Sequence, residues 1–312
     1  MTEGKMARGV IRTTVVTATA AACLIGVPTS GATFRGANGL LVYQAQAGKH
    51  IQLFTIRPDG TGRRQITHLR DSDALNPAWS PDGRRIVFAR DYTVGTGHEH
   101  LDIVTVNADG GGLHGMALRG LNGDPTWSPD GRILWLRPGG FAISRAEGNG
   151  FRMIRVAGEN SSPTVSPDGR EIAFRRQLGE HESAIFVVSA KGGPARRVVA
   201  PAGGVADKID WSPDGSRIVL SAPEFGVGKQ PSSNVFTIRP DGSGLRQLTH
   251  SRGGHVNNGA DSWSPDGKRI AFVSNRGGGA YEICVMNADG THATAVTHTA
   301  AGGHLAAWGT NP

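Results

Sequence analysis

The chain has 312 residues, enough for one large domain or two ordinary ones. Its 46 glycines follow no collagen-like period and are typical of many turns between short strands, and a hydrophobic content of 38% excludes a disordered body. The formal charge of +7 comes from scattered residues without a basic run, which disfavours nucleic-acid binding.

The first 32 residues differ from the rest and are typical of a secretory signal peptide. Lys5, Arg8 and Arg12 precede an apolar run from Val15 to Val27. Ser30-Gly31-Ala32 then places small residues at the two positions that a signal peptidase reads. We therefore expect cleavage after Ala32, export to the periplasm or cell exterior, and no integral membrane span afterwards.

Two alternatives to cleavage stay open from the sequence alone. The acidic Glu3 and the long basic region also fit an uncleaved anchor, and Cys23 lies in a poor lipoprotein motif. Cleavage would leave Cys284 as the only cysteine, which excludes an intramolecular disulfide, and would lower the formal charge to +5.

A five-residue motif, Trp-Ser-Pro-Asp-Gly, recurs through the remaining chain. It begins at Trp79, Trp127, Trp211 and Trp263, and a fifth copy begins with Val165 in place of tryptophan. These positions and a final tryptophan are 38 to 52 residues apart, the size of a four-stranded propeller blade. We expect one domain over 33–312 with six blades at about 38–79, 80–127, 128–165, 166–211, 212–263 and 264–308.

Each repeat contains the same succession of predicted strands. The chain opens with an apolar strand at 38–43 that has no motif before it. In each later repeat the motif is followed by an apolar, β-branched strand such as 86–89, a variable loop, a second strand such as 101–106, a tight turn and a third strand. The last strand, 304–308, has no partner after it, so we expect it to complete blade one and close the ring.

Ser-Pro-Asp-Gly itself predicts a hairpin corner. Proline presets φ at the first central position, aspartate tolerates the second, and glycine accepts a positive φ. The tryptophan before the corner has the apolar area to wedge between neighbouring blades. A catalytic reading of the serine and aspartate needs a base within reach, and no histidine recurs at a fixed spacing.

These repeats resemble the TolB-type PD40 family of WD40-like propeller repeats over about residues 38–311. The resemblance implies an all-β fold, a six-bladed β-propeller. The mature chain enters blade one within about ten residues of the expected cut, so we expect it to lack the N-terminal α/β domain of TolB proper, which argues against a Tol–Pal role. Related propellers are fused to serine peptidase domains, but no G-x-S-x-G motif follows here.

The candidate site lies on the top face of the expected propeller, opposite the Ser-Pro-Asp-Gly corners. Irregular loops gather there, at 91–100, 223–233 and 251–261, and such loops on a repeated scaffold build binding surfaces. The alternative is that their polar residues are simply solvated. The candidate binding residues at the channel mouth are Asn76, His98, His100, Asp124, Ser162, Asp207, His255, Asn257, Asp261 and His304. His68, His250 and His298 end equivalent Thr-His strands, which predicts surface positions set by the repeat.

Two functions remain from the sequence. The first is a secreted, monomeric, non-catalytic binding or scaffold propeller whose partner is a protein, peptide or carbohydrate. The alternative is a metal-assisted enzyme that acts on acidic oligosaccharides, as propellers resembling oligogalacturonate lyase do. His98-Glu99-His100 is a short pair that can bind a metal with a third ligand, although the sequence assigns no catalytic residue, metal or cofactor. Three or more converging histidines would favour the enzyme.

Overall fold

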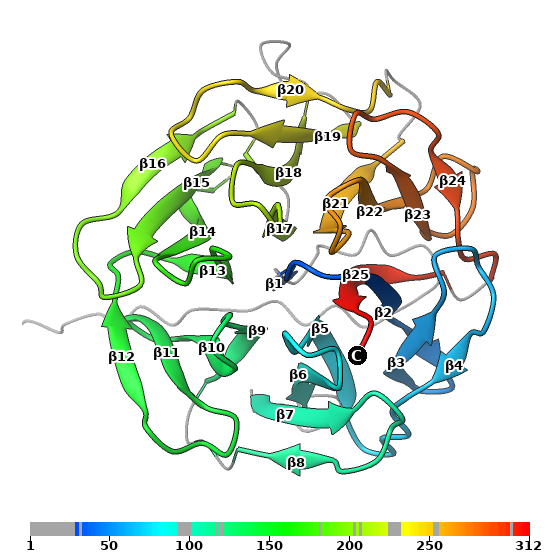
Figure 1. The fold of residues 1–312 in the computed structure, drawn as a ribbon, viewed down its shortest axis with the longest axis horizontal. Helices are drawn as coiled ribbons and strands as arrows, with labels where there is room; N and C mark the ends of the chain where they lie inside the picture. Colours follow the sequence, from blue (N-terminus) through cyan, green and yellow to red (C-terminus); the bar gives the residue numbers. More distant parts are fainter. Residues whose placement is uncertain are drawn as a thin grey trace, which may run out of the picture.

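The chain forms a ring of six β-sheets around a central axis (Figure 1). The computed structural model describes residues 29–30, 33–92, 101–116, 118, 121–180, 182–201, 204–205, 208–223, 232–251, 256–299 and 302–312. Within these ranges all regular secondary structure is strand, as the all-β expectation requires. No helix in the described ranges has the length and apolar character needed to cross a membrane.

Each blade has four antiparallel strands running from the axis outward, and one sheet has the short parallel strand β1 (Thr29–Ser30) as a fifth at its inner edge. The inner strands are β25 (His304–Thr310), β5 (Asp73–Trp79), β9 (Gly123–Trp127), β13 (Asn160–Val165), β17 (Lys208–Trp211) and β21 (Asn258–Trp263). The second strands are β2 (Asn38–Ala47), β6 (Arg85–Asp91), β10 (Arg132–Arg137), β14 (Glu171–Gly179), β18 (Ile218–Pro223) and β22 (Arg269–Ser274). The third strands are β3 (His50–Ile56), β7 (Leu101–Asn107), β11 (Gly140–Arg145), β15 (Glu182–Ser189), β19 (Ser233–Ile238) and β23 (Glu282–Asn287). The outer strands are β4 (Arg64–Gln65), β8 (His114–Gly115), β12 (Arg152–Arg155), β16 (Arg196–Val199), β20 (Arg246–Gln247) and β24 (Thr294–Ala295).

The C-terminal strand closes the ring as the sequence predicts. β25 pairs antiparallel with β2, with Trp308 opposite Leu41, so the first blade is built from both ends of the chain. The expected blade boundaries are offset by one strand, because each tryptophan strand opens the sheet that follows its corner. The second sheet, for example, runs from 73 to 115 instead of from 80 to 127. A hairpin corner joins strands of one sheet, which is why the strand before it belongs with the strand after it.

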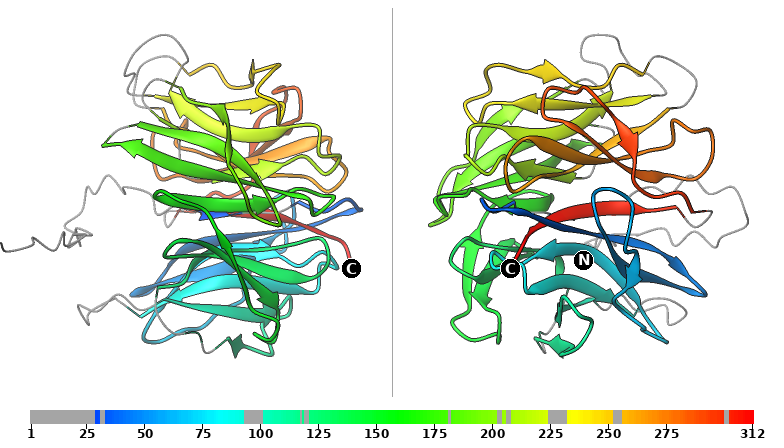
Figure 2. Two further views of the ribbon diagram at one scale, coloured as in Figure 1. Left: turned by 90° about the vertical axis from the view of Figure 1, so that its left-hand side faces the viewer. Right: turned by 45° about the vertical axis from the view of Figure 1, so that its right-hand side comes forward.

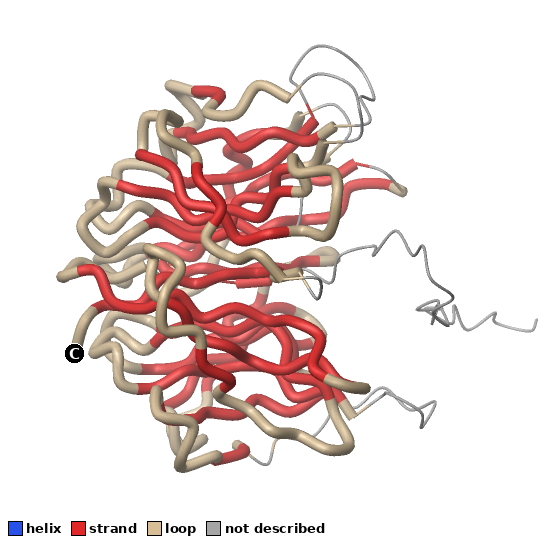
Figure 3. The backbone as a smooth tube through the Cα atoms, turned by 90° about the vertical axis from the view of Figure 1, so that its right-hand side faces the viewer, coloured by secondary structure: helices blue, strands red, loops and turns tan. Residues whose placement is uncertain are grey.

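The Ser-Pro-Asp-Gly segments are hairpin corners. In the first copy, the backbone N–H of Gly83 donates to the Ser80 carbonyl at 2.9 Å, and φ at Gly83 is 68°. The Ser80 hydroxyl donates to Asp82 at 2.6 Å and accepts from the backbone N–H of Arg85 at 2.9 Å. These corners gather on one face of the ring, the bottom face, where the C-terminal Thr310 also contacts Pro81, and the strands cross from there to the top face (Figures 2 and 3).

Tryptophans hold the blades together. Six buried hydrophobic clusters each combine side chains from two neighbouring sheets. Trp127, for instance, is fully buried and packs with Ala78 and Val87 of the preceding blade. Val165 fills the same place between blades three and four, packing with Leu134. The predicted wedge between blades is therefore confirmed.

Candidate functional site

Four inner strands have a left-handed residue three residues before the tryptophan position, and this residue is short and polar in three of them and Leu305 in the fourth. Asn76, Asp124 and Ser162 have φ values of 57°, 47° and 52°, in the left-handed region. Short polar side chains tolerate this region better than apolar ones, and the proline that follows each of them has no backbone N–H to pair. The pairing register with the second strand shifts there, and backbone N–H groups at the shift donate to side chains of the preceding blade.

These three residues join four blades through hydrogen bonds. The backbone N–H of Asn76 donates to Gln44 Oε1 at 2.8 Å, and its side-chain amide donates to Asp124 Oδ1 at 2.9 Å. The other oxygen of Asp124 accepts from the backbone N–H of Ser162 at 3.0 Å. All four residues are buried. Asn76, Asp124 and Ser162 are therefore not solvated loop residues but part of the channel wall.

The other side of the channel wall carries buried charge. Lys208 and Asp210 lie on β17 and Asp261 lies on β21, and none of the three is more than 2% exposed. The Lys208 ammonium donates to the Ala306 carbonyl on β25. Asp210 Oδ2 accepts from the backbone N–H of Trp263 at 3.0 Å and from the Ser262 hydroxyl at 3.1 Å.

Burial shifts the pKa of each of these three groups in the direction that favours its uncharged form. The pKa of Asp210 is raised to about 6 by burial, against the lowering effect of its hydrogen bonds and of Lys208. The pKa of Asp261 is raised to about 7 by burial, against the attraction of Lys208 and of the Ala306 backbone. Burial also lowers the pKa of Lys208, although both carboxylates oppose this. We call Lys208, Asp210 and Asp261 the channel charge cluster.

The start of the described chain lies inside the channel. β1 (Thr29–Ser30) pairs in parallel with Lys208 and Ile209 of β17, near the centre of the ring (Figure 1). Thr33 is 2% exposed, and its hydroxyl hydrogen-bonds to Asp210, to Ser262 at 2.9 Å and to the Trp263 carbonyl at 3.0 Å. No element was expected here from the sequence.

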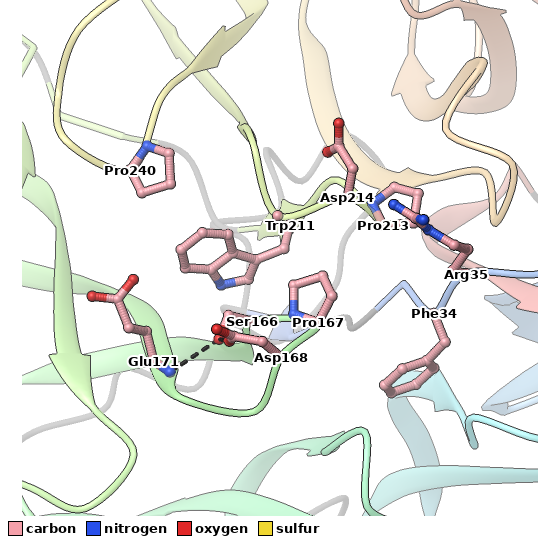
Figure 4. Close-up of a pocket in the computed structure, with 11 residues that line it drawn as sticks. Phe34, Arg35, Ser166, Pro167, Asp168, Glu171, Trp211, Pro213, Asp214 and Pro240 are labelled. Carbon is pink, nitrogen blue, oxygen red and sulfur yellow. Dashed lines mark hydrogen bonds between the residues drawn. The ribbon is translucent and has the colours of Figure 1, made fainter.

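This segment leaves the channel at the bottom face. Phe34 packs with Ala78 and Trp127, and the backbone N–H of Gly36 donates to the Pro265 carbonyl at 3.2 Å. Two pockets of about 490 and 710 Å³ flank Arg35 between neighbouring corners. Figure 4 shows the smaller one, lined by Phe34, Arg35, Ser166, Pro167, Asp168, Glu171, Trp211, Pro213, Asp214, Gly215 and Pro240.

The aspartates of these pockets serve their own corners. The Ser166 hydroxyl donates to Asp168 at 2.6 Å and lowers the pKa of that carboxyl. Ser212 makes the same bond to Asp214 at 2.5 Å. The pockets therefore present an apolar floor of proline and tryptophan beside Arg35, and the corner aspartates are committed to turn geometry, whereas the Glu171 carboxylate pairs with Arg196 at 3.6 Å.

Of the remaining predicted site residues, Asn257 and His304 are among the described residues and four others are not. Asn257 joins the starts of β19 and β21, since its side-chain oxygen accepts a hydrogen bond from the backbone N–H of Ser233 at 3.2 Å. His304 begins β25, contacts the Tyr281 ring at a centroid distance of 5.1 Å, and has a pKa lowered by burial. His98, His100, Asp207 and His255 lie outside the described residues. His68, His250 and His298 are exposed, as the repeat predicts.

The described ranges hold no group of three or more histidine, cysteine, aspartate or glutamate side chains placed to bind a metal ion. Sequence reasoning selected Asp261 but missed Lys208 and Asp210. The available signal was the segment Lys-Ile-Asp-Trp, in which two charged residues stand within a predicted inner strand. Charged residues are rarely fully buried, so such a strand marks a position with special contacts.

The repeat corners, the blade order and the closing strand agree with one family of propellers. The family model described as the TolB beta propeller domain, PD40, matches residues 29–209 and 140–311. The chain belongs to the TolB β-propeller family. The resemblance found in the repeats is thereby confirmed.

Individual relatives match this TolB-type propeller either over a short stretch of sequence or over the fold at low sequence identity. The Tol-Pal system protein TolB of Alcanivorax borkumensis is 34% identical over 80 residues, which are 25% of this chain and only 18% of that protein. The structure of TolB from Acinetobacter baumannii superposes with a TM-score of 0.71 at 21% identity, covering 88% of this chain and 67% of that one.

Propellers from proteins that are not TolB share the fold of this TolB-type propeller. A chain of the nidogen/laminin complex matches with a TM-score of 0.64 at 11% identity, over 87% of this chain and 98% of that one. An oligogalacturonate lyase from Vibrio parahaemolyticus matches with a TM-score of 0.52 at 13% identity, over 76% of this chain and 71% of that one. At these identities the likeness establishes the fold alone.

Proposed function

We propose that this TolB-type propeller is an exported, non-catalytic binding protein that docks a protein or peptide on its top face. The observation that carries this proposal is the course of residues 33–36. They fill the bottom end of the channel with the chain's own contacts, through Thr33, Phe34 and Gly36. A partner therefore has better access to the opposite face, where the irregular connections of the repeat begin and end.

Described residues on the top face include exposed apolar side chains. Leu178 is 47% exposed at the hairpin between β14 and β15, and Leu121 is 42% exposed just before β9. Exposed leucines on an irregular face suit a protein or peptide partner better than a charged sugar. The nidogen/laminin structure is a complex that contains a propeller of this fold.

Export is part of the proposal and rests on the N-terminal sequence. The basic start, the apolar run and the small residues at 30–32 support cleavage after Ala32. N-terminal sequencing of protein from the periplasm or medium tests this. Protein recovered only from the cytoplasm with Met1 in place would contradict export.

Docking is tested by cross-linking the exported protein in the cell envelope, identifying the adduct and rebinding the purified pair. Leu178→Glu should weaken rebinding at least about tenfold if the top face is the interface. Leu113→Glu is the matched control, since Leu113 is 48% exposed near the bottom face, just before β8. Loss of binding with Leu113→Glu alone would contradict top-face docking.

The alternative enzyme is separated from this proposal by metal analysis. The purified protein is incubated with Mn²⁺, and bound metal is measured for the wild type and for the His98→Ala and His255→Ala variants. The binding proposal expects no stoichiometric metal. Bound metal that both variants lose, together with cleavage of oligogalacturonide, would favour the lyase-like reading.

A further inference from the structure

The channel charge cluster does not balance its own charge. Asp210 and Asp261 are carboxylates and Lys208 is the one ammonium among the three, and all are at most 2% exposed. When all three groups are ionised, the cluster carries a net charge of −1. An uncompensated buried charge is expensive, because it has lost its hydration without gaining a partner.

The cluster also lacks hydrogen-bond donors. Among the described residues, the Oδ1 atom of Asp210 has no hydrogen-bond partner, and the Asp261 carboxylate faces the Ala306 backbone without a well-formed hydrogen bond to either of its oxygens. The Lys208 ammonium hydrogen-bonds to the Ala306 carbonyl and makes no hydrogen bond to either carboxylate among the described residues. Buried carboxylate oxygens are normally satisfied, so this site calls for a cationic donor.

Thr33 lies at this site. Its hydroxyl is hydrogen-bonded to Asp210 and to Ser262, and the residue is 2% exposed. Covalent geometry keeps the α-nitrogen of a threonine within about 4 Å of its own hydroxyl oxygen. The α-nitrogen of Thr33 is therefore close to the carboxylate of Asp210.

Thr33 is also the residue that follows the peptide bond at which the sequence predicts signal-peptide cleavage. We propose that hydrolysis of the Ala32–Thr33 bond places the α-ammonium of Thr33 in the channel, as the counter-ion that completes the channel charge cluster. Water supplies the oxygen of the new Ala32 carboxylate, the carbon–nitrogen bond breaks, and the Thr33 nitrogen is protonated to an ammonium. A peptidase of the signal-peptidase class catalyses the step, so the inference rests on the export part of the proposed function.

The new ammonium has what the cluster lacks. It carries one positive charge, which brings the net charge of the ionised cluster from −1 to zero. It also has three N–H donors for the three oxygens without a well-formed hydrogen bond. Cleavage removes the short pairing of β1 with β17, and the new N-terminus would in its place hold the inner ends of blades five and six together.

The pH dependence follows from the raised pKa values of Asp210 and Asp261. A carboxyl whose folded pKa is raised stabilises the fold at low pH, and this stabilisation is lost as the pH rises through about 6 and about 7. A neighbouring ammonium lowers both values and prevents that loss. The advantage of a free Thr33 amine should therefore be large at pH 7.5 and small at pH 5. Other ionisable groups on the strands and segment around the channel are Arg35, Asp73, Asp124 and His304.

The experiment compares two N-termini of the exported protein. Full-length chains are expressed either with the native leader or with a leader cut one residue earlier, so that Ala32 is retained. Mass spectrometry identifies each N-terminus, and thermal unfolding is followed from pH 5 to pH 8. We expect the protein that begins at Thr33 to melt at least about 3 °C higher at pH 7.5, with a difference below about 1 °C at pH 5.

Variants assign the difference to the cluster. In the Asp210→Asn/Asp261→Asn double variant, the two N-termini should melt together at every pH. Asp124→Asn is the matched control on the far side of the channel, where the difference between the N-termini should persist. A native leader cut at another bond, equal melting of the two forms at pH 7.5, or a difference that survives in the double variant would each overturn the inference. An exported protein with another first residue would leave export and docking intact, so the two failures are distinguishable.

Discussion

At the scale of single residues, the corner aspartates act through hydrogen bonds inside their own turns. Asp130 accepts from the Ser128 hydroxyl and, at 2.7 Å, from the guanidinium of Arg132. Burial alone would raise the pKa of Asp130, but these bonds and the charge of Arg132 outweigh it and lower the pKa. The ionised carboxylate is thus the form that holds the corner.

Asp130→Asn should destabilise the fold by about 0.5–1 kcal/mol at pH 7, since an amide accepts these bonds less strongly and the Asp130 side chain is 53% exposed. The lowered pKa means that the wild-type advantage is present above the ordinary aspartate pKa and is lost as the pH falls through the folded value. Urea titrations at pH 7 and pH 3 measure both effects. Glu147→Gln is the control, as it removes one exposed charge without a corner bond. A loss of stability that is equal at both pH values would contradict the ionic origin.

Residue-level sequence reasoning worked where the cause is local. The corner conformation could be predicted because proline and glycine set their own φ angles. The burial of Asn76 and Asp124 could not, because it arises only when six inner strands converge on one axis. Lys208 escaped notice for the same reason, since its partner Ala306 is 98 residues away.

At the scale of elements, arginines on the outer strands connect neighbouring blades. The guanidinium of Arg246, on β20, donates to the Asp289 carbonyl in the turn of the next blade at 3.0 Å. The equivalent bonds join Arg64 to Asp109, Arg152 to Ala190 and Arg196 to Pro240. The outer strands are only two to four residues long, so these bonds supply contacts that the sheets themselves lack there.

Arg246→Ala should therefore cost about 0.5–1 kcal/mol, and all four arginine-to-alanine changes together about 2–4 kcal/mol. The bonds are far apart on the ring, so near-additive effects are expected. Thermal unfolding of the single and quadruple variants provides the measurement. Arg170→Ala is the control, because the Arg170 side chain is 85% exposed. If Arg246→Ala and Arg170→Ala melt alike, the bond to the next blade does not contribute.

The elements themselves were largely predictable. Runs of β-branched and aromatic residues marked the second and third strands, such as 101–106 within β7. The pairing of β1 was not, because a two-residue strand has no periodicity and forms only where β17 offers its edge. The offset of the blade boundaries has a similar origin, since sequence spacing shows the length of a repeat but not the strand at which a sheet begins.

At the scale of the whole molecule, the ring is closed by packing between its first and last strands. Trp308 on β25 is 1% exposed and packs with Ala271, Ile283 and Val285 of blade six. Its indole N–H donates to the Gly39 carbonyl at 3.3 Å. The next residue, Gly309, lies so close to blade two that a Cβ there would be 2.7 Å from the Trp79 ring. One strand therefore contacts three blades.

Deletion of 304–312 should unfold the ring or leave it prone to aggregation. It removes β25, and the edge of β2 then has no partner for its backbone groups. Trp308→Ala, which keeps the strand, should cost about 3–5 kcal/mol because it leaves a cavity between blades one and six. Thermal and urea unfolding measure both changes. Deletion of only Asn311 and Pro312, which are exposed, is the control and should have a small effect. A chain without 304–312 that unfolds at the same temperature as the full chain would show that β25 does not stabilise the ring.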